Sequence, residues 1–342
     1  MIIDSRGHRS PVSTPVRGAP APGVRVGLSP AAEAWAFVGA DLPLQRIAVT
    51  EVTLREGELL VEIELALVCA ADRRAVTGNR PQMLGHEQVG RIVALGTGPA
   101  PTTVDRVPLA IGDRIVWSAE APCGDCAACS IGRADGCQRP RRYGHEPARR
   151  GWELSGGLST HTHLLAHTPV VRARDWVPAT VVAPAACATS AVVAAFAAVD
   201  RAPAAVRRTL IVHGCGLRGL TAVAMGSERG AHVIAIDADP GRRADALALG
   251  ADAAVFPEEL LAADGILLDF RGDGTIITRG RDAVAEHVPR PRPPHLREAV
   301  RFLERADHAL FDRLVGETLS FDEAPRALAD PPARGVRFAV RP

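Results

Sequence analysis

The chain has 342 residues, of which 47% are hydrophobic and 23% are charged, and its formal net charge is +1. This composition is typical of a globular protein long enough for two domains, and the near-neutral charge gives no electrostatic basis for binding nucleic acid or an acidic membrane. All 40 residues counted as Lys or Arg are arginine, which excludes Schiff-base and general-base chemistry on a lysine.

Residues 1–24 are predicted to form a disordered leader. Met1 to Gly23 is rich in Pro, Arg, Ser and Gly and lacks the apolar centre of a signal peptide. No apolar run in the chain approaches the roughly 20 residues that span a bilayer. The sequence has seven cysteines, and the clustering of four of them suits a reducing compartment. We therefore expect a cytoplasmic protein with no membrane partner.

Short apolar segments broken by Gly and Pro follow the leader up to about residue 120. This alternation predicts a strand-rich domain with little helix. The expected strands are 46–52, 58–68, 88–95 and 113–117, with a further strand at 161–166 after the glycine pair 156–157.

Four cysteines lie in one short run with the spacing Cys-x2-Cys-x2-Cys-x7-Cys, at Cys123, Cys126, Cys129 and Cys137. Thiolates are soft ligands, and four of them complete a tetrahedral zinc shell with no open position. Such a site folds a lobe, here residues 120–140, and takes no part in catalysis. The alternatives are disulfides or scattered core thiols, but the spacing favours a structural metal.

The character of the sequence changes near residue 180. An alanine-rich helix is expected at 181–199, and a strand at 209–213 leads directly into a glycine-rich turn. A helix at 220–229 and a second strand at 232–236 follow the turn. A strand, a tight turn, a helix and a second strand in this order predict the first half of a doubly wound parallel sheet.

The turn reads Gly214-Cys215-Gly216-Leu217-Arg218-Gly219, and the second strand ends at Asp237. In this context the motif is a dinucleotide-binding fingerprint, because its glycines let a pyrophosphate approach the helix N-terminus. Asp237 would bind ribose hydroxyls and repel a 2′-phosphate, which favours NAD over NADP. The alternative is a glycine-rich turn without a ligand. Cys215 is expected to be only a small packed residue.

The second half of this sheet is predicted to be shortened. Strands are expected at 265–270 and 275–278, joined by a turn at 271–274. A turn this short leaves no room for a parallel crossover helix, which needs about ten or more residues. A proline-rich linker, 290–294, and a helix, 295–306, follow.

Three residues far apart in the sequence could together hold a metal with an open position. Cys69 ends an apolar strand, His86 lies in Gly85-His86-Glu87, and Cys187 lies at the start of the alanine-rich region. Two thiolates and one imidazole leave a fourth tetrahedral position for water or substrate, where zinc acts as a Lewis acid on an alcohol. Taken singly each residue is more often part of a core, and spacing alone cannot join them.

A family resemblance suggests that these three residues form one site. In the order of its motifs, the chain resembles the zinc-dependent medium-chain alcohol dehydrogenases over roughly residues 25–342. The matching pieces are Cys69-x-x-Asp72, Gly85-His86-Glu87, the four-cysteine lobe, Cys187 and the glycine-rich turn. The resemblance implies catalytic zinc on Cys69, His86 and Cys187, with Glu87 beside it or as an alternative ligand. It also implies that Asp72 orients the histidine, as carboxylates do for zinc-bound imidazoles.

The resemblance further implies an α/β protein with two domains, two zinc ions per chain and NAD. A GroES-like catalytic domain would take residues 25–180 and 307–342, and a shortened Rossmann domain would take residues 181–306. The cofactor-binding residues would be Gly214, Gly216, Leu217, Arg218, Gly219 and Asp237. The substrate would be a small alcohol or its carbonyl product, and a homodimer is one assembly that the family allows.

A narrower likeness is to the alcohol dehydrogenases associated with phosphonate catabolism, a relation that fixes no substrate. It is carried by Tyr143-Gly144-His145-Glu146, Leu154-Ser155-Gly156-Gly157, Pro184-Ala185-Ala186-Cys187-Ala188 and the stretch 294–303. Tyr143, His145 and Glu146 either line the substrate cleft or are surface or supporting residues.

Two departures from the family pattern leave a competing function open. Ala71 stands where the family usually has a Ser or Thr that relays the alcohol proton, and general acid–base help is worth roughly 10²–10⁴-fold. The shortened sheet removes part of the region that walls the nicotinamide and builds the dimer interface. The alternatives to a dehydrogenase are a catalytically reduced paralogue that acts as a binding or partner protein, and a zinc-free quinone reductase. The two ligand sets oppose the second alternative.

Overall fold

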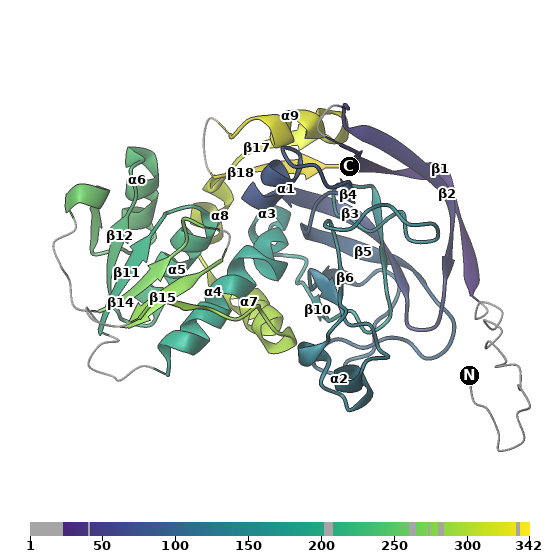
Figure 1. Cartoon of the computed structure of the whole chain (residues 1–342), viewed down its shortest axis with the longest axis horizontal. Coiled ribbons are helices and arrows are strands. Elements are labelled where there is room, and N and C mark those ends of the chain that lie inside the picture. Colours follow the sequence, from purple (N-terminus) through teal and green to yellow (C-terminus); the bar gives the residue numbers. More distant parts are fainter. Residues whose placement is uncertain are drawn as a thin grey trace, which may run out of the picture.

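The computed structural model describes residues 23–39, 42–201, 208–259, 265–272, 274–279, 284–332 and 336–342. The predicted leader, residues 1–24, lies outside the described residues except for its last two positions. Figure 1 shows two lobes, a strand-rich one that contains both the early strands and the C-terminal strands, and an α/β one built from the middle of the chain.

The strand-rich lobe holds the five strands expected from the alternating pattern together with five that were not predicted. They are β1 (Val24–Phe37), β2 (Gln45–Leu54), β3 (Leu59–Val68), β4 (Gln82–Met83), β5 (Glu87–Leu95), β6 (Arg114–Trp117), β9 (His161–Leu164), β10 (Val170–Arg172), β17 (Val315–Ser320) and β18 (Arg337–Arg341). One sheet has the order β2-β1-β4, and the larger has the order β10-β6-β5-β3-β18-β17 with β9 also paired to β3.

Strand β1 was not predicted from the sequence, because Gly27 and Pro30 interrupt its apolar pattern. The strand still pairs with β2 along its length, and a shift of register between Gly27 and Ala32 takes up the irregular residues. A bulge of this kind lets a strand tolerate residues that a regular ladder excludes.

The C-terminal strand β18 brings the end of the chain back to the first half of the strand-rich lobe. It runs antiparallel to β3, with Phe338 opposite Val68. Because Val68 directly precedes Cys69 and Phe338 directly follows Arg337, this register puts Arg337 next to the candidate metal residues.

The α/β lobe is a six-stranded sheet with helices around it (Figure 1). Its strands are β11 (Thr209–His213), β12 (His232–Ile236), β13 (Ala253–Val255), β14 (Ile266–Asp269), β15 (Ile276–Arg279) and β16 (Glu286–His287), and its order is β13-β12-β11-β14-β15-β16. The first four are parallel, whereas β15 and β16 are antiparallel. The predicted strand-turn-strand at 265–278 is therefore confirmed, and no crossover helix lies between β14 and β15.

The helices differ from the sequence expectations mainly at their ends. The expected helix 181–199 is broken, because Pro184 and Cys187 divide it into α3 (Ala179–Val182), the 3-10 turn η2 (Ala183–Ala186) and α4 (Ala188–Val199). The helix after the glycine turn begins earlier than predicted. The remaining longer helices are α5 (Leu217–Glu228), α6 (Pro240–Ala248) and α7 (Pro293–Arg305).

Short elements complete the described fold. They are α1 (Ala70–Ala75), β7 (Glu120–Ala121), α2 (Ala127–Ser130), η1 (Ala134–Gly136), β8 (Arg141–Arg142), η4 (Pro257–Glu259), α8 (His308–Arg313), η5 (Phe321–Glu323) and α9 (Ala324–Ala329). Within the described ranges no single helix is long and apolar enough to cross a membrane. The bent pair Ala179–Ala186 and Ala188–Val199, at 56° to each other, meets the length and composition test only together.

One buried hydrophobic cluster runs through both lobes. It contains Leu65 and Val89 from the strand-rich lobe, Val192 from α4, and Leu210 and Val212 from β11. Helix α4 and the turn η2 before it therefore lie between the two lobes, and Cys187, which joins η2 to α4, lies there with them.

Candidate metal and cofactor sites

The spacing Cys69-x-x-Asp72 is explained by the start of helix α1. Cys69 is the N-cap residue, and its sulfur accepts a hydrogen bond from the N–H of Ala71 at 3.2 Å. Asp72 reaches back, and its Oδ2 accepts the N–H of Cys69 at 2.9 Å. This reciprocal capping box fixes both side chains at the end of β3.

Asp72 also connects this helix start to His86. Its Oδ1 accepts the N–H of Gly85 at 3.2 Å and lies 3.3 Å from Nδ1 of His86. The other ring nitrogen, Nε2, lies 3.4 Å from the sulfur of Cys69. A zinc ion with ordinary bond lengths and tetrahedral angles would hold a sulfur and an imidazole nitrogen about 3.6 Å apart. The pair therefore fits a shared metal, and Asp72 sets the ring orientation that the metal needs.

The electrostatics of this group are those of buried ligands. Cys69, Asp72 and His86 are all buried, and their ligand atoms lie within 4.8 Å of one another. Burial raises the pKa of Cys69 to about 12. Burial alone would lower the pKa of His86, but the nearby Cys69 and Asp72 raise it well above its ordinary value. A bound cation would displace the thiol proton, since the thiolate is the ligand.

Cys187 lies near this group but outside its closest set. Its charge contributes to raising the pKa of both His86 and Arg337, which indicates that it lies near the same site. Within the described part of the chain, the set with ligand atoms inside 4.8 Å contains Cys69, Asp72 and His86 only. Cys187, the predicted third ligand, is therefore less close to Cys69 and His86 than these two are to each other.

Glu87 and Arg337 form a buried pair beside the metal residues. The carboxylate of Glu87 is fully buried, and Nε of Arg337 lies 3.6 Å from its Oε2. Among the described residues, the two carboxylate oxygens of Glu87 and Nε of Arg337 have no hydrogen-bond partner, while Nη1 of Arg337 donates to the carbonyl of Val336 at 3.2 Å. Sequence reasoning missed Arg337, and its only signal there is an arginine at the start of an apolar strand.

The predicted glycine turn joins β11 to α5 as the fingerprint requires. Gly214 has a φ of +89°, and a Cβ on Gly219 would lie 2.0 Å from the carbonyl oxygen of Gly214. Both positions therefore need glycine. A Cβ on Gly216 would meet nothing within 4 Å, so this residue leaves open space over the N-terminus of α5, where a pyrophosphate would bind.

Asp237 ends β12 and is tied to the glycine turn. Its Oδ2 accepts the N–H of Cys215 at 2.7 Å, and its Oδ1 accepts the N–H of Asp239 at 2.9 Å. Cys215 itself is fully buried, as predicted. Of the other predicted cofactor residues, Leu217 is buried, and the guanidinium of Arg218 donates to the carbonyl of Gly272 at 3.3 Å. These two side chains are thus engaged within the protein.

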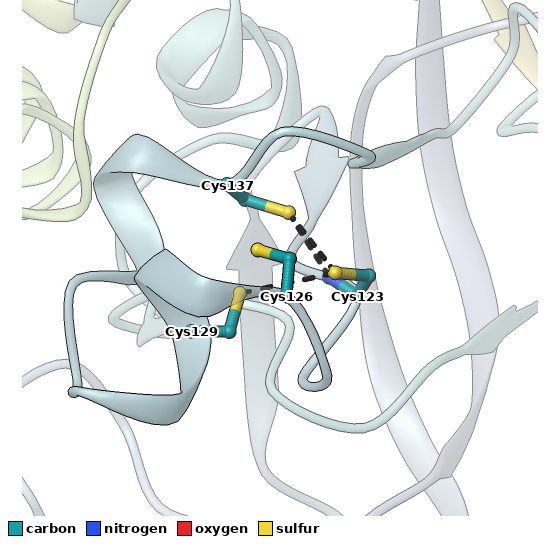
Figure 2. A group of neighbouring side chains, drawn as sticks. All are labelled: Cys123, Cys126, Cys129 and Cys137. Carbon is teal, nitrogen blue, oxygen red and sulfur yellow. Dashed lines mark hydrogen bonds between the residues drawn. The ribbon is translucent and has the colours of Figure 1, made fainter.

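The four-cysteine run folds into a compact loop around α2 and η1, and Figure 2 shows the four sulfur atoms turned toward a common centre. The sulfur of Cys123 lies 3.5 Å from that of Cys137 and 4.0 Å from that of Cys129. A tetrahedral Zn–S₄ site places its sulfurs about 3.8 Å apart, whereas a disulfide holds them at about 2.05 Å. All seven cysteines are free, so the geometry fits a structural metal and not disulfides.

The backbone of this loop is arranged to hold thiolates. N–H groups of Gln138 and Cys129 point at the sulfur of Cys126 and lower the pKa of its thiol to about 6. The N–H of Cys123 donates to the sulfur of Cys137 at 3.3 Å. Such bonds stabilise the deprotonated form that zinc binds.

The segment Tyr143-Gly144-His145-Glu146 packs against the candidate metal site. The ring of His145 lies against that of His86, with centroids 4.5 Å apart and planes at 37°. Burial, together with His86, lowers the pKa of His145 to about 3. Tyr143 is fully buried, and the carboxylate of Glu146 accepts the N–H of Arg142 at 2.9 Å.

The chain is similar in sequence to known alcohol dehydrogenases. Residues 55–175 match the alcohol dehydrogenase GroES-like domain. The chain is 30% identical over 230 residues to erythritol/L-threitol dehydrogenase of Mycolicibacterium smegmatis, covering 62% of this chain and 59% of that protein. It is 32% identical over 202 residues to 5-exo-hydroxycamphor dehydrogenase of Pseudomonas putida, covering 57% and 54%. The chain thus spans less than two thirds of these relatives.

Solved structures share the fold over most of the chain. An alcohol dehydrogenase from Thermotoga maritima superposes with a TM-score of 0.77 at 23% identity, covering 91% of this chain and 99% of that one. A zinc-binding dehydrogenase from Sinorhizobium meliloti bound to NADP gives 0.69 at 20% identity, covering 91% and 99%. The chain is therefore similar to zinc-type alcohol dehydrogenases, through a GroES-like domain at residues 55–175 and through the fold that it shares with the solved alcohol dehydrogenases. The phosphonate-associated subgroup is not distinguished by these relatives and stays a prediction.

Proposed function

We propose that the protein is a zinc-dependent oxidoreductase that transfers a hydride between an alcohol or polyol and NAD(H). The observation that carries this proposal is the approach of Cys69 and His86 to 3.4 Å, with Asp72 behind the imidazole and Cys187 near the same site. A structural protein has no need for a second pair of buried metal ligands apart from the four-cysteine loop. Related sequences include erythritol/L-threitol dehydrogenase and L-galactonate-5-dehydrogenase, which supports a polyhydroxylated substrate.

In this proposal the chain's own residues bind and orient the reacting groups. Cys69, His86 and Cys187 would hold the catalytic zinc, and Cys123, Cys126, Cys129 and Cys137 the structural zinc. When bound, zinc would supply a Lewis acid for the alcohol oxygen, and NAD would supply the hydride acceptor. Asp72 keeps Nε2 of His86 directed at the metal position, since it faces Nδ1. Glu87, held near Arg337, adds negative charge next to that position.

NAD is proposed over NADP because of the carboxylate at the end of β12. Asp237 lies at the carboxyl edge of the parallel strands, and it is anchored by the N–H groups of Cys215 and Asp239. Each carboxylate oxygen can accept a further bond from a ribose hydroxyl, and the negative charge disfavours a 2′-phosphate.

The alcohol proton would leave by a route that does not use residue 71. Ala71 has no hydroxyl, so water or the substrate's own hydroxyls would carry the proton away from the cleft. The free state of all seven cysteines suits a reducing compartment, and we propose a cytoplasmic location. A homodimer remains the proposed assembly.

The test replaces Cys69 by serine and measures both turnover and metal content. We expect bound zinc to fall from two ions to one per chain, with turnover lost and the structural site intact. The matched control is Cys215→Ser, a buried thiol outside both ligand sets, which should keep both zinc ions and its activity. In a fluorescence titration, the wild type should bind NADH saturably and NADPH more weakly, and it should show turnover. Unchanged turnover in Cys69→Ser would refute the assignment of Cys69 as a zinc ligand, and failure to bind either cofactor would favour the partner-protein alternative.

A further inference from the structure

The sequence Gly-His-Glu occurs twice in this site, and its two copies lie back to back. The first copy, residues 85–87, carries the candidate ligand His86, and the second, residues 144–146, carries His145. Gly144 approaches so closely that a Cβ on it would lie 2.1 Å from the carbonyl oxygen of Gly85. This contact brings the two imidazole rings to 4.5 Å between centroids.

His145 is held in place from both sides. On one side Tyr143 is buried, and its phenol oxygen accepts the N–H of Leu165 at 2.8 Å and bonds to Thr168 at 2.7 Å. On the other side the carbonyl of Glu146 accepts the N–H of Met83 at 2.8 Å. A side chain whose neighbours are fixed in this way is preorganised, and its position at the metal site is not an accident of a mobile loop.

The ring of His145 is partly buried but has no hydrogen-bond partner among the described residues. The polar side chains around it already have partners. Asp72 accepts hydrogen bonds from Cys69 and Gly85, and Glu146 interacts with Arg142 and Arg149. Ala71 presents no polar group to the cleft. An imidazole without a partner next to an open metal position offers a hydrogen bond to whatever binds there, and in either charge state it keeps at least one N–H.

We propose that His145 is a substrate-binding residue. Its imidazole forms a hydrogen bond with a second hydroxyl of the substrate, on the carbon next to the one that is oxidised. The preferred substrates are then vicinal diols and polyols, and simple alcohols are discriminated against. The inference rests on the proposed function, because it takes the first hydroxyl to lie at the metal position beside His86. The physical reason is that a substrate without the second hydroxyl leaves the imidazole desolvated and unpaired, which a site built for a hydroxyl rejects.

The test compares His145→Phe with the wild type on butane-2,3-diol and butan-2-ol, which share a carbon skeleton and differ in one hydroxyl. Phenylalanine keeps a stacked ring against His86 and removes both nitrogens. We expect the affinity for the diol to fall by roughly tenfold. The affinity is measured by calorimetry on the zinc-loaded protein with NADH, which cannot accept a hydride, so that no turnover occurs during the titration. Affinity for butan-2-ol should rise, because His145→Phe leaves no unpaired imidazole. The zinc content should stay unchanged, and His145→Gln should restore part of the diol affinity.

Three outcomes would overturn the inference. The first is an equal loss for both ligands or a loss of zinc in His145→Phe, because His145 would then only support His86. The second is an unchanged diol affinity in the variant. The third is a wild type that binds the diol no better than butan-2-ol. Calorimetry separates these results from failure of the proposed function, which would appear as absent turnover whatever the binding preference.

Discussion

The contact between Gly144 and Gly85 predicts the effect of one added methyl group on the metal site. In Gly144→Ala the new Cβ would lie 2.1 Å from the carbonyl oxygen and 2.6 Å from the carbonyl carbon of Gly85. Both neighbours are backbone atoms, so no side-chain rotation relieves the overlap. The carbonyl of Gly85 also accepts the N–H of Gly157 at 2.8 Å, and separating the two loops strains this bond as well.

The expected destabilisation of the fold by Gly144→Ala has two parts. Gly144 has a φ of +68°, and a side chain in this left-handed region costs about 1–2 kcal/mol. Overpacking against fixed backbone adds about 1–3 kcal/mol. The control is Gly151→Ala in the same loop, where φ is +79° but nothing lies within 4 Å of the added Cβ. Gly151→Ala therefore carries the first part alone, and the difference between the two variants isolates the contact.

Two quantities are measured for each variant, the free energy of unfolding and the number of bound zinc ions. Urea unfolding should show Gly144→Ala to be less stable than Gly151→Ala by about 1–3 kcal/mol. Because the two loops must part, His86 moves away from Cys69, so Gly144→Ala should lose the catalytic zinc while keeping the four-cysteine zinc. If Gly144→Ala matched Gly151→Ala in stability and kept two zinc ions, the back-to-back packing would not be what positions His86.

Two further predictions concern the strand-rich lobe. Replacing Cys126 by serine should remove the structural zinc and destabilise the 120–140 lobe while leaving one zinc on the Cys69 site, measured by metal analysis and hydrogen exchange; retention of two ions would contradict the ligand assignment. Burial alone would raise the pKa of Glu58, but hydrogen bonds from His163 and Arg55 lower it below the ordinary value of 4.5 for a glutamate. This carboxylate therefore stabilises the fold above about pH 4.5, and its contribution is lost as the pH falls through its native pKa. Glu58→Gln should therefore cost about 1–2 kcal/mol at neutral pH and flatten the acid limb of the stability profile, and an acid limb equal to that of the wild type would refute this.

Patterns within one segment could be predicted from the sequence. The strands that hold Cys69 and Glu87 follow from alternation, and the hairpin of β14 and β15 follows from the shortness of the turn between them. Cys69-x-x-Asp72 is a local capping box, so the spacing of its residues is sufficient to suggest their contact. The metal site as a whole required the family resemblance, because Cys69, His86 and Cys187 lie in three separate segments of the chain.

Contacts between distant segments could not be predicted from the residues alone. Arg337 meets Glu87 only because β18 pairs with β3 in one register. His145 meets His86 only because two glycines allow their backbones to touch. Each depends on packing across many intervening residues, for which a single sequence carries no periodic signal. Strand β1 was missed for a different reason, since a bulge near Pro30 conceals its alternation.

The shortened sheet alters the surroundings of the cofactor edge without removing the edge itself. Strands β11, β12 and β14 are parallel, so their carboxyl ends meet on one side of the sheet, where the glycine turn and Asp237 also lie. The hairpin that replaces the crossover helix is attached to this same side, because Arg218 donates to Gly272 and the side chain of Arg271 packs near Gly214. Parallel order is lost only at β15 and β16, on the far side of β14 from β12. Under the proposed function, the adenosine half of a dinucleotide would therefore meet a parallel, doubly wound edge, and the shortening would affect the nicotinamide half.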